Sequence, residues 1–542
     1  MVTCNDTLYE SIRKTAIKKL DSEAIYYLGA SITYKKLLTD IDALSTWLAY
    51  SGIDRGDVVT ICMPNIPQSV VCLYALSKLG AVAHMVHPLA PKIQLENYMN
   101  SVNSKMLIIP DLFLDRHKEI VDSGKPTLVC SPAHYLGIAK RTAYAVKMHS
   151  EISYAKKMPN VTKYSLAVKY QSKRLVGCGG EDDVVYLHSG GTSGEPKTIR
   201  LSSRAINSLC MCSKEILNEP NFNEGGMLAT LPMFHGFGLA MGVHAMLMLG
   251  GTVVLMPKFN PEEVVKLIEK NKINYIIGVP ILYETLLKTA GFNGDKLKNL
   301  RQSFVGGDFV PIRLIDEFNT LMKNNNSHAR LYEGYGLTET VTVCCVNNSI
   351  HSNKGSVGKP NSSVEIACFN ATERLGANVS GEICISGSQL MSGYLNDEKA
   401  TNEVFFKDQD GKLWVRSGDV GYIDKEGYVF FKSRIKRIAK VRGITVFPSE
   451  IENLCMNEFS EIKEAHAVSA PDDELGSAIV MFICPKQIMD ETQKAKLREN
   501  LTDFVESRLS VYARPRNIFF LSELPKTLIG KVDSNKLKEI YL

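Results

Sequence analysis

Apolar and polar positions alternate along most of the chain in a pattern typical of α/β proteins. Short apolar runs rich in β-branched residues predict buried strands at residues 57–63, 81–86, 227–231, 251–255 and 275–279. Between them, apolar residues at helical spacing predict amphipathic helices at 68–79 and 261–270. This alternation predicts an α/β fold with mainly parallel sheets flanked by helices.

One uncharged stretch, residues 239–256, imitates a membrane span because it lacks Asp, Glu, Lys and Arg. It contains His244, and the pair Gly250–Gly251 divides it before a β-branched run. A spanning helix needs roughly 20 uninterrupted apolar residues. We therefore expect a buried helix, a glycine turn and a buried strand.

The pattern changes after about residue 430, where residues 431–437 (Phe-Lys-Ser-Arg-Ile-Lys-Arg) form a short basic connector. Beyond it we expect a helix opening at Pro448, strands around 465–469 and 478–483, and a helix at 492–509. A chain of 542 residues is too long for one core. We predict a large N-terminal domain at 1–432, a hinge at 433–437 and a small, mobile α+β domain at 438–542.

Composition narrows the class of protein without naming it. Apolar residues make up 45% and the net charge is only +5, which fits a soluble globular protein and does not favour nucleic acid as a partner. The 13 cysteines are scattered and none shows zinc-ligand spacing, so we expect reduced thiols and a cytoplasmic location. The N-terminus lacks the apolar segment of a signal peptide, and the sequence leaves the oligomeric state open.

Residues 131–174 carry nine Lys or Arg residues against one acid, Glu151, with tyrosines interspersed. The favoured interpretation is a solvated basic surface. The alternative is peripheral contact with an anionic membrane, such as the inner membrane surface, or reception of an amphiphilic substrate.

A glycine-rich loop, residues 189–197 (Ser-Gly-Gly-Thr-Ser-Gly-Glu-Pro-Lys), follows a strand-like run and is a candidate phosphate site. Glycines let backbone N–H groups turn toward a phosphate, hydroxyls add donors, and a lysine adds charge. The sequence is not the usual P-loop, and a flexible surface turn is the alternative. The candidate ligands are Ser189, Gly190, Gly191, Thr192, Ser193, Gly194 and Lys197.

Three later segments indicate that the phosphate bound by this loop belongs to a nucleotide. Thr338 beside Glu339 can hold a phosphate oxygen and Mg²⁺ together, with a capped turn as the alternative. Asp419 follows a glycine turn and can accept ribose hydroxyls, with an Asx-turn as the alternative. Lys531 follows Gly530 near the C-terminus and is a candidate cation that reaches from the second domain to the phosphate. The alternative is an exposed lysine on a mobile loop.

In this order and spacing, these segments resemble the adenylate-forming superfamily of acyl-CoA synthetases, luciferases and adenylation domains. The resemblance runs from about Ser31 to the end and includes residues 231–238, 306–308, 381–383 and 448–452. It implies a reaction in two steps. A carboxylate attacks the α-phosphate of ATP, releasing pyrophosphate and leaving an acyl-adenylate, and a thiol then takes the acyl group as AMP leaves.

The resemblance also implies roles for individual residues. The loop at 189–197 would hold the β- and γ-phosphates, Thr338 the α-phosphate, and Glu339 the Mg²⁺. Lys531 would bridge the carboxylate and the α-phosphate, Lys436 would be the hinge, and Lys440 with Gly443 would open a channel for pantetheine. Ribose and adenine contacts would come from Asp419, Arg434, Gly306, Gly307, Asp308, Tyr335 and Gly336.

The branch of the family is indicated by His235, which lies in the uncharged aromatic segment 234–238. Amino-acid adenylation domains usually carry an Asp near this motif, so His235 favours acyl- or aryl-CoA ligases, although a core histidine is the plain alternative. The basic 131–174 segment favours fatty acids. We therefore expect a stand-alone acyl-CoA ligase that uses ATP, Mg²⁺ and coenzyme A.

Three other functions stay open: an acyl-AMP ligase that loads a carrier protein, an aryl-CoA ligase, and a non-catalytic nucleotide-binding or lipid-surface protein. The chain departs from the common pattern at Gly190, Thr198, Ser433, Arg437 and Val532. None of these changes removes a candidate catalytic group. The changes in the connector leave the identity of the thiol acceptor open.

Overall fold

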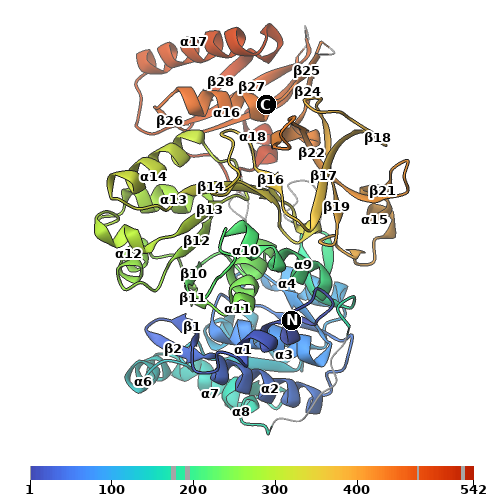
Figure 1. Cartoon of the computed structure of the whole chain (residues 1–542), viewed down its shortest axis with the longest axis vertical. Helices are drawn as coiled ribbons and strands as arrows, with labels where there is room; N and C mark the ends of the chain where they lie inside the picture. The colour runs from blue at the N-terminus through green and yellow to red at the C-terminus, as the bar shows by residue number, and fades with distance from the viewer. Residues whose placement is uncertain (1, 172–178, 190–195, 443, 473–474, 527–531) are drawn as a thin grey trace.

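The computed structural model describes residues 2–171, 179–189, 196–442, 444–472, 475–526 and 532–542. The chain builds from one end of the molecule to the other, with the N-terminal sheet at the bottom of Figure 1 and the small C-terminal unit at the top. Two large sheets and a smaller antiparallel sheet precede the C-terminal unit.

The first sheet has eight strands in the order β20-β9-β8-β4-β3-β5-β6-β7. The strands from β8 to β7 in that order pair in parallel, and β9 and β20 are antiparallel additions at one edge. Their bounds are β3 (Val58–Ile61), β4 (Val82–Met85), β5 (Met106–Pro110), β6 (Thr127–Cys130), β7 (Val161–Lys163), β8 (Asp183–His188), β9 (Thr198–Ser202) and β20 (Gly393–Tyr394).

Helix α3 (Pro67–Leu79) connects β3 and β4, as the sequence pattern predicts. It begins with Pro67 in its first turn, where proline's missing N–H has no helical partner to lose. It ends at Gly80, which adopts a left-handed conformation with φ of 83°. The expected strand, helix and strand are thus confirmed within one or two residues at each boundary, but the expected amphipathic character of the helix is wrong, because every residue of α3 is buried between the sheet and neighbouring helices.

The second sheet has nine strands in the order β16-β15-β14-β13-β12-β10-β11-β1-β2, parallel from β14 to β1. The strands are β1 (Glu23–Tyr27), β2 (Ala30–Thr33), β10 (Gly226–Ala229), β11 (Thr252–Leu255), β12 (Tyr275–Gly278), β13 (Gln302–Val305), β14 (Leu331–Gly336), β15 (Val343–Val346) and β16 (Lys359–Pro360). Its helices include α12 (Pro261–Glu269), α13 (Pro280–Lys288) and α14 (Ile312–Asn324).

The uncharged stretch folds as expected. A π-helical segment, Phe237–His244, runs into α11 (Ala245–Leu249). Gly250 then turns the chain with φ of 81° into β11. Within the described part of the chain, no helix is both long and apolar enough to cross a membrane.

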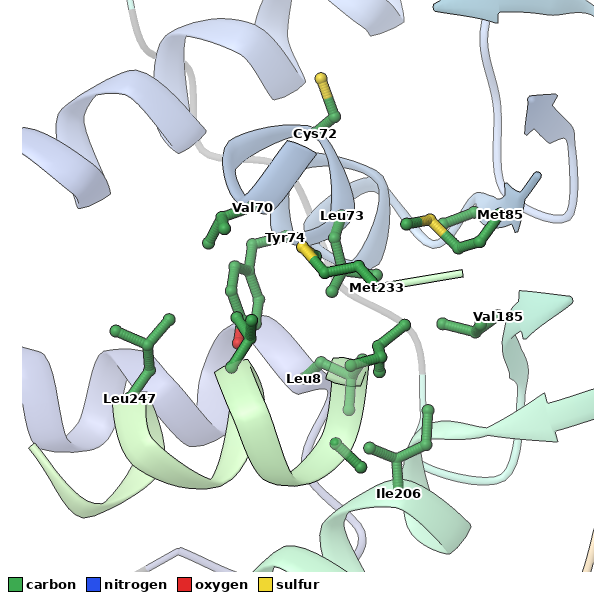
Figure 2. Close-up of a cluster of buried hydrophobic side chains, with 14 of the residues drawn as sticks. Leu8, Val70, Cys72, Leu73, Tyr74, Met85, Val185, Ile206, Met233 and Leu247 are labelled. Atoms are coloured by element: carbon green, nitrogen blue, oxygen red, sulfur yellow. The ribbon is translucent and has the colours of Figure 1, made fainter. Parts of the chain in front are cut away.

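The largest apolar core lies where α3 meets α1 (Leu8–Ala16), α9 (Ser203–Met211), α11 and the first sheet. In Figure 2, Tyr74 of α3 points toward the helix that carries Leu247, whereas Cys72 points away from it. The Tyr74 hydroxyl lies 2.9 Å from Nδ1 of His244, and Nε2 of His244 lies 2.8 Å from Oδ1 of Asn207. Hydrogen bonds therefore satisfy this buried imidazole within the apolar core.

The third sheet is antiparallel, in the order β18-β17-β19-β22-β21, with β23 also pairing with β22. Its core packs Phe369 against the fully buried Trp414. The strands are β17 (Val364–Asn370), β18 (Glu373–Arg374), β19 (Gly381–Gly387), β21 (Phe405–Lys407), β22 (Leu413–Ile423) and β23 (Val429–Arg434).

The C-terminal unit has its own apolar cores. A three-stranded sheet, β26 (Ile462–Asp472), β27 (Gly476–Pro485) and β28 (Pro515–Phe520), accompanies the hairpin β24 (Ala439–Val441) and β25 (Ile444–Val446). The helices are α16 (Pro448–Glu458), α17 (Glu491–Arg508) and α18 (Ser534–Tyr541). The strand pair and both helices expected from the sequence are present, so the α+β character of this unit is confirmed.

The basic segment forms α6 (Ile138–Lys147), α7 (His149–Lys157), β7 and α8 (Tyr164–Ala167). Its tyrosines attach it to the large domain: the hydroxyls of Tyr135, Tyr144 and Tyr154 donate to carboxylates at 2.7, 2.5 and 2.5 Å. No side chain of α6 is buried, and its lysines and arginine face outward. The segment thus has a fixed tyrosine side and an exposed basic side.

Candidate active site

The ends of the glycine-rich loop are held together at its mouth. Ser189 follows β8 and Lys197 precedes β9, and the N–H of Ser189 donates to the carbonyl of Lys197 at 2.9 Å. In return, the N–H of Lys197 donates to Oγ of Ser189 at 3.0 Å. Gly190, Gly191, Thr192, Ser193 and Gly194 lie outside the described residues. The described ends therefore fix where the candidate phosphate loop begins and ends.

A tyrosine joins this loop to the candidate metal ligand. Strand β20 pairs with β9 and places Tyr394 opposite Ile199. The Nζ of Lys197 lies 4.7 Å from the centre of the Tyr394 ring, a cation–π distance. The Tyr394 hydroxyl donates to Oε1 of Glu339 at 2.9 Å. Lys197 and Glu339, 142 positions apart in the sequence, thus share one neighbour. Tyr394 stands in a motif, Gly393–Tyr394, that matches the family, but the sequence prediction assigned it no role.

The Tyr394 hydroxyl stays protonated because burial and the nearby Glu339 carboxylate raise its pKa above its usual range. It can therefore only donate to Glu339 at neutral pH. One carboxylate oriented in this way suits Mg²⁺, which usually takes one or two carboxylates together with phosphate oxygens. The described residues contain no group of three or more His, Cys, Asp or Glu side chains that could hold a metal alone.

The turn that carries Thr338 and Glu339 ends in a strained residue. Val341 has φ of 67° and ψ of −62°, a conformation that β-branched residues rarely adopt. The N–H of Thr342 donates across it to the carbonyl of Thr340 at 2.8 Å. Such strain costs on the order of 1–3 kcal/mol and is commonly found at functional sites. Sequence patterns gave no signal for it, because it depends on the packing around the turn.

Gly236 explains how this turn is held against the segment of His235. A Cβ atom at Gly236 would lie 1.8 Å from the carbonyl oxygen of Val341, so only glycine permits the approach. Next to it, the His235 ring lies 4.7 Å from the ring of Phe234 and is partly exposed. His235 therefore borders the site, and the fully buried core histidine of this region is His244.

The candidate ribose and adenine residues form a second cluster. The hydroxyl of Tyr335 donates to Oδ2 of Asp419 at 2.6 Å, and Nε of Arg434 lies 3.4 Å from Oδ1. Asp419 and Arg434 are direct partners in the β22–β23 ladder, and the Asp419 side chain is 4% exposed. Burial, with the Asp419 charge, raises the pKa of Tyr335 well above its usual range. The structure thus brings these three predicted residues together.

Three glycines shape the floor next to Tyr335. A Cβ atom at Gly306 would lie 2.7 Å from the carbonyl of Gly334, and one at Gly336 would lie 1.3 Å from the carbonyl of Thr342. Gly307 has φ of 83°, which other residues rarely adopt. Asp308 is exposed beside them, and its Oδ1 accepts from the N–H of Phe309. The predicted adenine frame is therefore a surface of closely packed backbone.

A narrow apolar cavity ends at this floor, with a volume of about 80 Å³. Its wall has no charged side chain and consists of Ile216, Leu217, Met227, Phe237, Met241, Ile277, Phe304, Val305, Gly306, Gly307, Gly334, Tyr335, Gly336, Thr342, Val343 and Val346. A more open groove of about 660 Å³ lies elsewhere, between α14 and Asn457 of α16. The apolar cavity is the one that shares Gly306, Gly307, Tyr335 and Gly336 with the candidate nucleotide site.

The basic connector is attached at both ends. Arg434 faces Asp419 of the third sheet, and three residues later Arg437 donates to Glu452 of α16 and to the carbonyl of Ala467 at 3.1 Å. Burial would raise the pKa of Glu452, but the charges of Arg437 and His466 outweigh it and hold that pKa below its usual range. Lys436 lies between these two anchors.

The remaining predicted residues belong to the C-terminal unit. Lys440 is exposed on β24, and its Nζ donates to Oγ1 of Thr445 at 2.6 Å. Gly443 and Lys531 lie outside the described residues. Lys526 and Val532, the described residues on either side of 527–531, form an antiparallel bridge. The roles of Lys440, Gly443 and Lys531 stay predictions.

The chain thus folds into a large α/β domain and a small C-terminal α+β domain, and the two clusters are its candidate nucleotide site. A family model described as "AMP-binding enzyme" matches residues 12–395, and its C-terminal domain model matches 450–531. The chain belongs to the AMP-binding enzyme family.

Curated relatives match nearly the whole chain. A long-chain-fatty-acid–CoA ligase of Bacillus subtilis (strain 168) is 30% identical over 552 residues, covering 99% of this chain and 94% of the relative. The 4-coumarate:CoA ligase 1 of Petunia hybrida is 28% identical over 542 residues, covering 98% and 91%.

Solved structures share the fold. ATP-bound MatB from Rhodopseudomonas palustris has a TM-score of 0.79 at 21% identity, covering 99% of both chains. O-succinylbenzoate coenzyme A synthetase from Bacillus subtilis, in complex with ATP and a magnesium ion, has a TM-score of 0.76 at 21% identity and covers 98% and 99%.

Proposed function

We propose that this protein is an ATP-dependent acyl-CoA ligase that activates a carboxylic acid as acyl-AMP and transfers the acyl group to coenzyme A. The observation that carries the proposal is the meeting of an uncharged cavity with the nucleotide clusters at Gly306, Gly307 and Tyr335. An acid whose chain lies in this cavity presents its carboxylate beside the α-phosphate of ATP. The CoA ligases among the curated relatives support the same reaction.

In the first half-reaction, Asp419 accepts hydrogen bonds from the ribose hydroxyls, and Arg434 balances the charge of the Asp419 carboxylate. Lys197 and the loop 189–197 bind the β- and γ-phosphates, and Thr338 binds the α-phosphate. Mg²⁺, held by Glu339 and phosphate oxygens, would neutralise charge that develops on the phosphates. Thr338 and Mg²⁺ act on charge that grows at the α-phosphate in the transition state, so they accelerate the reaction, whereas Asp419, Arg434, Lys197 and the loop mainly bind ATP.

Lys531 is the proposed cation between the carboxylate and the α-phosphate. It belongs to the C-terminal unit, so its visit to the site depends on the orientation of that unit. The hinge proposed at 433–437 lies where the chain passes from Arg434, which contacts the third sheet, to Arg437, which contacts α16, so a change of orientation between the two units would turn the backbone of this short connector. After rotation, Lys440 and Gly443 would line the path of the pantetheine thiol. Lys436→Pro should slow thioester formation more than adenylation, because proline stiffens the pivot.

The proposed substrate class is a fatty acid. No side chain that lines the cavity is charged, and only those of Thr342 and Tyr335 carry a hydroxyl, so the cavity offers no charged partner for a second charged group on the acid. Its volume of about 80 Å³ is far below the ~300 Å³ of ordinary ligand pockets, so a long chain requires side chains to move. Met227 and Met241 are suited to this, because methionine changes rotamer easily.

One screen separates this proposal from its alternatives. Pyrophosphate release and acyl-CoA formation are measured with ATP, Mg²⁺ and coenzyme A over short-, medium- and long-chain fatty acids and aromatic acids. Fatty acids should give both products. Adenylate without CoA thioester would instead favour an acyl-AMP ligase that loads a carrier protein, and a preference for aromatic acids would favour an aryl-CoA ligase. No pyrophosphate with any acid would favour a non-catalytic nucleotide-binding protein.

We also propose that the protein is cytoplasmic and touches anionic membranes through α6. This helix presents Ile138 and Val146, 76% and 73% exposed, beside Lys140, Arg141 and Lys147. Exposed apolar residues flanked by basic ones are typical of helices that lie on anionic lipid surfaces. The protein should sediment with vesicles that contain phosphatidylglycerol and not with phosphatidylcholine vesicles. Equal binding of wild type and the double variant Ile138→Ser, Val146→Ser would contradict the proposal.

A further inference from the structure

A chain of buried and half-buried polar side chains crosses five neighbouring strands of the first sheet below the mouth of the phosphate loop. In sheet order it runs from β9 through β8, β4 and β3 to β5. Oγ1 of Thr198 lies 3.4 Å from Nδ1 of His188, and Nε2 of His188 lies 2.8 Å from Nε2 of His84. Nδ1 of His84 lies 3.0 Å from Oγ1 of Thr60.

The chain ends on the backbone of β5. Oγ1 of Thr60 donates to Oγ of Ser104 at 2.7 Å, and Oγ of Ser104 donates to the carbonyl of Met106 at 3.0 Å. Since a carbonyl oxygen can only accept, the hydroxyl proton of Ser104 must point to Met106. This end therefore fixes the direction of every hydrogen bond that precedes it.

The proton positions follow from that direction. The Thr60 hydroxyl donates to Ser104, so Thr60 must accept from His84, whose Nδ1 then carries a proton. A neutral His84 is left with an unprotonated Nε2, which accepts from Nε2–H of His188. A neutral His188 then accepts at Nδ1 from the Thr198 hydroxyl. All five side chains are satisfied in a single arrangement.

The surroundings keep both imidazoles neutral. His84 is fully buried, and burial with the neighbouring His188 lowers its pKa well below the usual range. Burial lowers the pKa of His188 to about 4. From α4 (Lys92–Ser101), Tyr98 stacks on the His188 ring with centroids 3.8 Å apart. An aromatic neighbour at this distance holds the ring plane without supplying charge.

The hydrogen-bond chain lies next to both ends of the phosphate loop. His188 directly precedes Ser189, and Thr198 directly follows Lys197. His188 and Thr198 also face each other in the β8–β9 ladder, next to the two hydrogen bonds between Ser189 and Lys197. The side-chain contact therefore reinforces the backbone where the loop enters and leaves the sheet.

We propose that His84 and His188 are positioning residues, which hold the mouth of the phosphate loop through one proton-ordered hydrogen-bond chain anchored at Met106. They touch no substrate in this scheme and act through Ser189 and Lys197. The proposal rests on the phosphate-binding role proposed for the loop at 189–197. It assigns these residues to ATP affinity and leaves the chemical step to the residues described above.

Steady-state kinetics with varied ATP test this role. His84→Leu removes both hydrogen bonds, and Thr60→Val removes the link to Ser104 while keeping the side-chain volume. Each should raise KM for ATP by about tenfold, the equivalent of about one buried hydrogen bond, and change kcat at saturating ATP by less than about threefold. His84→Gln keeps an acceptor for His188 and should restore KM to within about threefold of wild type.

Val59→Ala is the matched control, because it removes buried volume from the same strand, β3, without touching the chain. It should leave KM for ATP unchanged. Equal effects of Val59→Ala and Thr60→Val on KM would overturn the proposal, because the change would then reflect general destabilisation of the sheet.

The second measurement uses wild-type protein and does not depend on catalytic turnover. In wild-type protein with ¹⁵N-labelled imidazoles, NMR should show His84 protonated only at Nδ1 and His188 only at Nε2, both unchanged between pH 6 and pH 8. Titration of either ring in that interval, or the opposite tautomers, would overturn the proposal. Wild-type protein without ATP turnover would count against the proposed ligase function, while the NMR result would still decide the hydrogen-bond order.

Discussion

Tyr394→Phe removes one hydroxyl from the junction of the phosphate loop and the proposed metal ligand. The variant keeps the ring below Lys197 but leaves Glu339 Oε1 without its donor at 2.9 Å. A hydrogen bond to a charged group contributes about 1.5–3 kcal/mol. If that bond orients Glu339 for Mg²⁺ in the transition state, its loss should lower kcat/KM for ATP by about ten- to a hundredfold.

The assay is acid-dependent ATP–pyrophosphate exchange as a function of Mg²⁺ concentration. Tyr394→Phe should require more Mg²⁺ for half-maximal exchange, because a less ordered carboxylate binds the cation less well. Tyr154→Phe is the matched control: it removes the same hydroxyl from a tyrosine–carboxylate pair on the surface, with Asp122, away from the clusters. An unchanged exchange rate and Mg²⁺ dependence in Tyr394→Phe would refute the reasoning.

Three further outcomes follow from the geometry. Burial lowers the pKa of His244 to about 3 in the folded protein. Below about pH 6.5, His244 is therefore protonated in the unfolded protein but not in the folded one, so the free energy of unfolding falls as the pH is lowered. Between pH 7.5 and pH 5, wild type should lose about 2 kcal/mol of unfolding free energy more than His244→Gln, measured by urea denaturation; parallel losses would mean that His244 titrates normally. Gly336→Ala should abolish detectable nucleotide binding in calorimetry because its Cβ meets the Thr342 carbonyl, whereas Gly376→Ala, with open space around it, should bind normally. Lys531→Ala should lose adenylation by at least about a hundredfold yet convert supplied acyl-AMP to thioester at near wild-type rate, and equal loss of both steps would argue against alternating domain orientations.

The periodic parts of the chain could be predicted from sequence because their burial is local. Helix α3 illustrates this, since Pro67 and Gly80 bound an apolar run at both ends. The helix, turn and strand of the uncharged stretch could be predicted in the same way, because Gly250 divides the stretch where the chain turns into β11. The α/β class and the α+β character of the C-terminal unit follow from such elements.

The candidate site could be predicted from the sequence only in part. Asp419, Tyr335 and Arg434 were found through their motifs, but their contact arises from the pairing of β22 with β23 and from the position of β14. Gly393–Tyr394 belongs to the matching motifs, but the sequence gave Tyr394 no role, because its contact with Glu339 depends on a two-residue strand that joins β9 nearly two hundred residues away in sequence. The strain at Val341 and the chain through His84 and His188 are properties of three-dimensional packing, which no local pattern encodes.

Isotope transfer tests the central claim most directly. With a fatty acid labelled with ¹⁸O in its carboxylate, turnover with ATP and coenzyme A should place one ¹⁸O atom in AMP, read by mass spectrometry. The label moves because a carboxylate oxygen attacks the α-phosphate and stays with AMP when the thiol displaces it. Label in inorganic phosphate, or acyl-CoA formed with unlabelled AMP, would contradict an acyl-adenylate intermediate and with it the proposed function.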